Sequence, residues 1–137
     1  MYTGPGKKDY RVKVKKTLVC VSTNDWIKAY ARDGDWLLIE YETNSSNGNR
    51  MGYVQGKKIK NFKDVSTLPK ANIPIRIVRS CVMTDDPNVR GRILLDIPSG
   101  THGTLLCLYG ERWGYVEMEI DRVLVRGFVN QNDYEFE

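Results

Sequence analysis

The chain has 137 residues, of which 41% are hydrophobic and 28% are charged. This is globular composition, and it excludes a disordered tail, a collagen and a disulfide-rich miniprotein. Apolar runs stay far below the roughly 18 residues of a membrane span, so we expect none. The first residues lack the hydrophobic stretch of a signal peptide. We expect a cytoplasmic protein if Met1 is the true start, and an envelope or secreted protein if the chain is a fragment.

The formal charge of +4 is unevenly distributed along the chain. Residues 1–70 hold 14 Lys and Arg against 7 Asp and Glu, a charge of +7; residues 71–137 hold 7 Arg against 10 acidic residues, a charge of −3. The asymmetry indicates an anionic partner for the first half, attraction between the halves, or drift in composition on solvated faces. The candidate anion-binding residues are Lys7, Lys8, Lys13, Lys15, Lys16, Lys57, Lys58 and Lys60.

Alternation with a period of two dominates the first half. It predicts strands over residues 11–15, 18–22, 26–30, 36–41 and 50–55, with residues 43–49 as a hairpin loop. The polar segment 61–71 breaks this pattern and contains Pro69. We interpret residues 62–70 as a linker or docking strap, with Phe62 and Leu68 packed against a neighbouring unit.

The second half shows the same alternation. Strands are predicted near residues 75–83, 92–95, 104–108, 113–119 and 123–130. Helical spacing is not sustained over three turns in any window. Several short strands separated by turns predict an all-β protein made of small barrels.

The two halves repeat one order of features. A charged turn precedes Trp36, and Gly-Tyr-Val follows at residues 52–54; a charged turn precedes Trp113, and Gly-Phe-Val follows at residues 127–129. A proline turn lies upstream in each half, at residues 3–6 and 84–87. The ordered set indicates an internal repeat with domains at 1–61 and 71–137.

These motifs resemble bacterial SH3-like domains, which are small five-stranded barrels. Thr-Gly-Pro-Gly at residues 3–6 resembles their early Ser-Gly-Pro turn, and Asp85-Asp86 departs from it in the second copy. The resemblance implies two barrels in tandem, the first with its N-terminal strand shortened or missing. Such an open edge could pair with another chain or a second copy. The aromatic grooves of the family map to Trp36 and Tyr53, and to Trp113, Phe128 and Tyr134.

Catalytic and metal-binding patterns are poor in this sequence. His102 is the only histidine, and the cysteines, Cys20, Cys81 and Cys107, form no C-x-x-C pair. We expect the cysteines to be small buried residues. We expect no catalytic residue, cofactor or metal, and therefore no enzyme.

Three functions remain open. The first is a recognition module that binds a peptide, a protein or a cell-wall fragment as an adaptor, targeting segment or small inhibitor. The second is nucleic-acid binding by the lysine-rich first half, through phosphate contacts. The third is a structural spacer or assembly domain.

Overall fold

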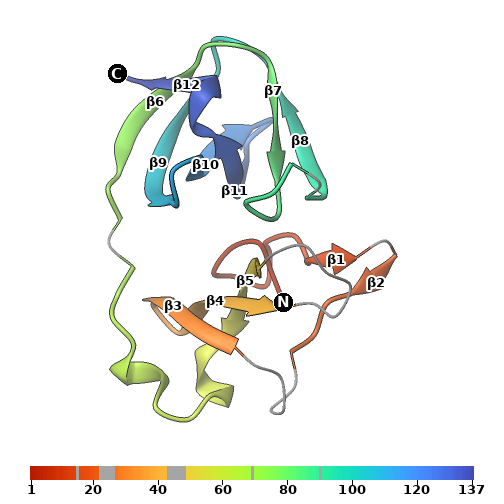
Figure 1. Cartoon of the computed structure of the whole chain (residues 1–137), viewed down its shortest axis with the longest axis vertical. Coiled ribbons are helices and arrows are strands. Elements are labelled where there is room, and N and C mark those ends of the chain that lie inside the picture. Colours follow the sequence, from red (N-terminus) through yellow and green to blue (C-terminus); the bar gives the residue numbers. More distant parts are fainter. Residues whose placement is uncertain (15, 22–26, 43–48, 69, 90) are drawn as a thin grey trace. The chain divides into compact units, whose positions relative to one another are not determined.

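The computed structural model describes residues 1–14, 16–21, 27–42, 49–68, 70–89 and 91–137. The chain divides into two compact units, Met1–Leu68 and Pro69–Glu137. Both consist of strands joined by turns and short 3-10 helices (Figure 1), which confirms the predicted all-β class. Lys15, Trp26 and most of the predicted hairpin loop at residues 43–49 lie outside the described residues.

The first unit contains a small hairpin and a three-stranded antiparallel sheet. Gly34, with a φ of +61°, makes the tight turn that leads into Trp36. The sheet has the order β3-β4-β5, so β3 is an edge strand among the described residues. The elements are β1 (Lys13–Val14), β2 (Thr17–Leu18), β3 (Ile27–Asp33), β4 (Trp36–Glu42), β5 (Asn49–Gln55), η1 (Gly56–Lys58) and η2 (Phe62–Asp64).

Alternate residues of β4 supply the core of the first unit. Leu37 and Ile39 are buried and pack with Met1, Val12 and Tyr41. This follows from the pleat of the strand, because residues two apart face the same side.

The segment after η2 is held against the edge of β3. The Arg32 amide donates to the Ser66 carbonyl at 2.8 Å, and the Leu68 amide donates to the Arg32 carbonyl at 2.7 Å. Leu68 is buried and Phe62 half-buried. Residues 62–68 of the expected linker or strap therefore belong to the first compact unit.

The second unit is one antiparallel sheet with the strand order β12-β6-β9-β10-β11-β7-β8. The single strand predicted over residues 75–83 is wrong, because the chain bends at Val78–Ser80 and changes partners: β6 pairs with β9 and β12, and β7 pairs with β8 and β11. The elements are β6 (Ile73–Ile77), β7 (Cys81–Thr84), β8 (Ile93–Ile97), β9 (His102–Tyr109), β10 (Trp113–Ile120), β11 (Val123–Asn130), η3 (Gln131–Asp133) and β12 (Tyr134–Phe136). The strand pairings of the described residues leave this sheet open rather than closed into a barrel.

The pairing of the tryptophan strand with the strand after it has the same register in both units. Each tryptophan opens its strand and lies opposite an amide residue that ends the next one. The corresponding pairs are Trp36/Gln55 and Trp113/Asn130, Leu38/Tyr53 and Tyr115/Phe128, and Ile39/Gly52 and Val116/Gly127.

The strand before each tryptophan also matches. One extra residue bulges at the same place, Tyr30 in β3 and Leu106 in β9. The turn upstream of these strands is closed by an equivalent backbone hydrogen bond in each unit. In the first unit the Thr3 amide donates to the Tyr10 carbonyl at 2.8 Å. In the second unit the Asp85 amide donates to the Arg92 carbonyl at 3.0 Å.

Candidate ligand-binding site

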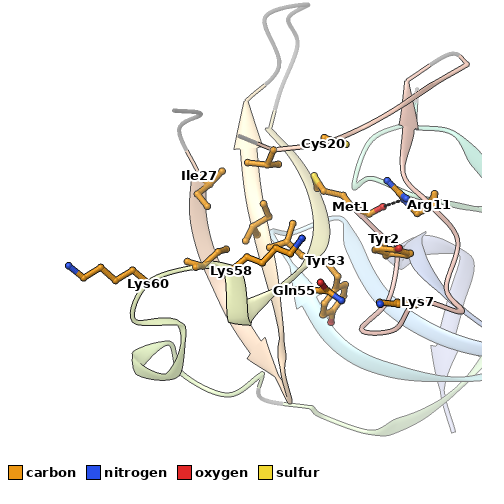
Figure 2. Close-up of a pocket in the computed structure, with 14 residues that line it drawn as sticks. Met1, Tyr2, Lys7, Arg11, Cys20, Ile27, Tyr53, Gln55, Lys58 and Lys60 are labelled. Atoms are coloured by element: carbon orange, nitrogen blue, oxygen red, sulfur yellow. Dashed lines mark hydrogen bonds between the residues drawn. The ribbon is translucent and has the colours of Figure 1, made fainter. Parts of the chain in front are cut away.

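The first unit contains an open cavity of about 570 Å³, a size at which proteins commonly bind ligands. Its wall comes from the N-terminal segment, the three-stranded sheet and the segment after β5 (Figure 2). The lining residues are Met1, Tyr2, Lys7, Arg11, Cys20, Val21, Ile27, Ile39, Tyr53, Val54, Gln55, Lys58, Ile59 and Lys60.

The wall of the cavity is largely aliphatic. Met1 and Ile39 are buried core residues, while Val54 and Ile59 are half-buried and packed on the same cluster. Ile27 contributes from the edge strand β3 and is also half-buried. An apolar ligand group placed here would be removed from water, which is the main source of affinity for such groups.

The polar lining of the cavity is cationic. Lys7 and Arg11 come from the N-terminal segment, and Lys58 and Lys60 from the segment after β5 (Figure 2). Among the described residues, none of those that line the cavity is acidic. The Arg11 Nε donates to the Met1 carbonyl at 3.1 Å, and its guanidinium lies 4.8 Å from the centre of the Tyr2 ring. The cavity thus combines apolar walls with positive charge, which suits a ligand that is both apolar and anionic.

An aromatic pair lies beside the cavity. Trp36, the first residue of β4, is half-buried and meets the ring of Tyr2 edge to face, with 5.3 Å between centroids. Tyr2 and Tyr53 both line the cavity, but Tyr53 is fully buried. Of the two aromatic residues predicted for this groove, Trp36 is therefore the one with exposed surface.

In the second unit the three predicted groove aromatics are separated by depth. Trp113 opens β10 and is half-buried. Phe128 is only 3% exposed, with 5.2 Å between its ring centroid and that of Tyr115. Tyr134 belongs to the core cluster, and burial raises the pKa of its hydroxyl to about 12. Only Trp113 among the three has substantial surface for a ligand, and its role stays a prediction.

The structure brings together part of the predicted basic set. Lys7, Lys58 and Lys60 share the cavity, although Lys7 is about fifty residues away from the other two in the sequence. Lys57 instead pairs with Asp35 at 3.2 Å. Lys8, Lys13 and Lys16 do not line the cavity. The sequence reasoning missed Tyr2 and Arg11; the position of Tyr2 directly before the Gly-Pro turn was the one available signal.

The cysteines differ from expectation at one position. Cys107 is buried and Cys81 half-buried, but Cys20 is exposed and lines the cavity, so the prediction of burial is wrong for Cys20. Burial raises the pKa of the Cys81 and Cys107 thiols to about 11. His102 lies on the exposed end of β9, with its Nδ1 3.0 Å from a Glu137 carboxylate oxygen.

Comparisons with protein-family models, with curated proteins and with solved structures give no match for the chain. Within the described residues, no three His, Cys, Asp or Glu side chains gather as a metal ion would require. The same part of the chain contains no helix long and apolar enough to cross a membrane. The cavity and the internal correspondence of the two units are therefore the features of the molecule that bear on its function.

Proposed function

We propose that the chain is a non-enzymatic recognition module composed of two SH3-like units in tandem. The shared registers around Trp36 and Trp113, with a bulge at the same place in the preceding strand, support the SH3-like resemblance. Within that fold the ligand is a peptide or protein segment, or a cell-wall fragment, bound through aromatic surface. The single observation that carries the proposal is the Tyr2–Trp36 pair beside an apolar cavity with a cationic lining.

Physical chemistry favours a protein ligand at this site. Tryptophan and tyrosine offer large contact areas with few rotatable bonds and dominate binding energy at protein interfaces. Trp36 has both exposed surface and a rigid support, since the Tyr2 ring packs against it at 5.3 Å.

The test uses peptides selected by the whole protein from a random display library. We expect Trp36→Ala to weaken their binding roughly tenfold or more, as for an interface hot spot, and Trp36→Phe to weaken it less. Trp113→Ala is the matched control, because it removes the corresponding side chain of the second unit. Peptides that bind a folded Trp36→Ala variant as tightly as the parent would contradict the proposal for the first unit. Retention on insoluble peptidoglycan would redirect it to a cell-wall ligand.

Nucleic-acid binding is a second candidate, because Lys7, Lys58 and Lys60 line the same cavity as Tyr2. Single-strand binders combine such cations with aromatic stacking surfaces. A dT oligonucleotide that binds more tightly than every selected peptide, with affinity falling steeply in salt, would favour this candidate.

A further inference from the structure

In the second unit, strand β6 fills the place that corresponds to the cavity of the first. Strand β6 lies between β9 and β12 and pairs with both. Its alternate residues Ile75 and Ile77 are fully buried in the core of this unit. The same core cluster includes four residues of other elements, Met83, Val116, Val129 and Tyr134, together with Ile97, Leu105, Met118 and Val125.

The same four positions line the cavity of the first unit. The shared registers match Val116 with Ile39 and Val129 with Val54. Tyr2 faces Tyr53 as Thr84 faces Phe128, and this matches Met1 with Met83. Gly56 and Gln131 each begin a 3-10 helix, and the amide of each donates at 2.8 Å to the carbonyl of the residue before the tryptophan of its unit. Ile59 and Tyr134 are the residues that directly follow these helices, so they correspond. Met1, Ile39, Val54 and Ile59 all line the cavity.

The sheet edge that β6 uses in the second unit is also available in the first. In the second unit β6 pairs with residues 102–105 of β9. The matched bulges align Gly103 and Leu105 of β9 with Ile27 and Ala29 of β3 in the first unit. Within the described part of the first unit, no strand pairs with residues 27–29 on the side away from β4. The segment at 66–68 pairs with β3 only at Arg32. The first unit thus combines an unpaired strand edge with an apolar cavity beside it.

The charges around the two places are opposite in sign. In the second unit Arg76 of β6 pairs with Glu135, and Arg79, two residues after β6, pairs with Asp133 at 2.5 Å. Lys58 takes the position of Asp133 as the third residue of its 3-10 helix, and Lys60 follows two residues later, as Glu135 does. Both lysines are exposed, and no ion pair is found for either among the described residues. A strand added here would therefore meet positive charge where β6 meets negative charge.

We propose that the first unit binds an extended acidic segment of a partner protein, which adds to β3 as an antiparallel strand. Its alternate aliphatic side chains enter the cavity as Ile75 and Ile77 enter the core of the second unit. Its carboxylates face Lys58 and Lys60. This strand addition is a known mode of peptide recognition, in which backbone hydrogen bonds supply affinity and side-chain pockets supply specificity. The inference deepens the proposed recognition function and rests on it.

Charge argues against a second copy of the chain as the occupant. The β6 segment of another copy would bring Arg76 and Arg79 against Lys58 and Lys60, and like charges in close contact oppose binding. The pattern expected of the partner is apolar-acidic-apolar-any-acidic, which is the pattern of residues 75–79 with both arginines exchanged for acidic residues.

The experiment titrates the full-length protein with two synthetic peptides. One has the sequence of residues 71–80 with Glu in place of Arg76 and Arg79, and the other keeps both arginines. We expect the acidic peptide to bind at least tenfold more tightly. We also expect it to slow alkylation of Cys20, because Cys20 lines the cavity. Amide hydrogen exchange should slow at those amides of residues 27–29 that point away from β4, because they would donate to the added strand.

Charge reversal supplies the decisive variant, since the side chains concerned are exposed and their loss leaves the core intact. Lys58→Glu with Lys60→Glu should reverse the preference between the two peptides. Lys57→Glu with Lys63→Glu makes the same change in net charge on nearby exposed residues that do not line the cavity, and it should preserve the preference.

Three results would overturn the inference. One is failure of the acidic peptide to bind at millimolar concentration. Another is an equal effect of both double variants, which would mean unspecific attraction between net charges. The third is tighter binding of the arginine peptide together with dimerisation of the protein, which would assign the edge to a second copy. If library peptides still depend on Trp36 in any of these cases, the recognition function stands and only the strand addition fails.

Discussion

Gly52 and Gly127 hold the same position in the two units and face corresponding residues, but at different distances. Both lie where a neighbouring segment crosses closely over the sheet. A β-carbon on Gly127 would come 2.8 Å from the backbone oxygen of Thr84 and 2.5 Å from Met83 Cγ. On Gly52 the nearest atom, at 2.4 Å, is the terminal methyl of Met1, while the Tyr2 oxygen is 3.4 Å away. The close contact at Gly127 involves the backbone, which cannot easily move, whereas the close contact at Gly52 can be relieved by rotation of the flexible Met1 side chain.

We therefore expect Gly127→Ala to destabilise the protein more than Gly52→Ala. Overpacking of a closed site costs about 1–3 kcal/mol, and the Gly127 variant should lie in that range. Urea unfolding of the full chain, followed by circular dichroism, measures both. Equal loss of stability in the two variants would mean that Met83 and the Thr84 backbone move aside as easily as Met1 does.

Asp85 closes the upstream turn of the second unit with its side chain as well as its backbone. Its carboxylate Oδ1 accepts the Arg92 amide at 2.9 Å, and its own amide donates to the Arg92 carbonyl at 3.0 Å. The backbone amide and the backbone carbonyl of Arg92 are thus both hydrogen-bonded to Asp85, which is buried. The aspartate closes this turn through a side-chain hydrogen bond, which is the role such residues commonly have in turns.

Strand β6 is an element of the second unit that has no counterpart among the described strands of the first. Truncation of a buried aliphatic residue in it should cost about 2–5 kcal/mol, because the cavity left behind is only partly refilled. We expect this of Ile75→Ala, since Ile75 is fully buried between β9 and β12.

Ile73→Ala is the control on the same strand, because that side chain is 37% exposed. Urea midpoints and slopes of the two variants give the comparison. A cost for Ile73→Ala as large as that for Ile75→Ala would show that loss of strand propensity, rather than loss of core packing, decides the stability here.

The sequence predicted those elements whose signal is local. Trp36 and Trp113 follow tight turns and open alternating strands, and both strands begin where the pattern placed them. The prediction failed at residues 75–83, because apolar residues lie on both sides of the short bend at Val78–Ser80 and periodicity cannot register a change of partner. Strand β12 was missed because three residues carry too little pattern to identify a strand.

The candidate site was harder to predict than the strands, for a physical reason. Lys7 and Lys58 meet only because the N-terminal segment pairs with β5, through the Tyr2 and Tyr53 backbones. Charge counting found the basic half, but it could not separate Lys58, which lines the cavity, from Lys57, which is paired with Asp35. The cavity depends on pairing between strands that are far apart in the sequence, and the pattern of a short stretch of sequence does not reveal such pairing.

At the scale of the whole molecule, folding alters the protonation of three groups in the second unit. Burial raises the pKa of Cys81 and Cys107 from 9.0 to about 11, with the Asp133 carboxylate adding to the effect at Cys81. Burial likewise raises the pKa of Tyr134 from 10.0 to about 12. Between these values the unfolded chain has lost the protons and the folded chain still holds them.

The protein should accordingly lose stability in alkaline solution. The contribution of these three groups is complete below pH 9, decreases as the pH rises through 9–11 for the thiols, and decreases through 10–12 for the phenol. Urea midpoints at pH 8 and pH 10.5 measure the loss, and the midpoint at pH 10.5 should be lower. The double variant Cys81→Ala, Cys107→Ala should show a smaller fall between the two values, because only Tyr134 then remains of the three. An unchanged fall would mean that other groups, such as the lysines of the first unit, determine the alkaline stability.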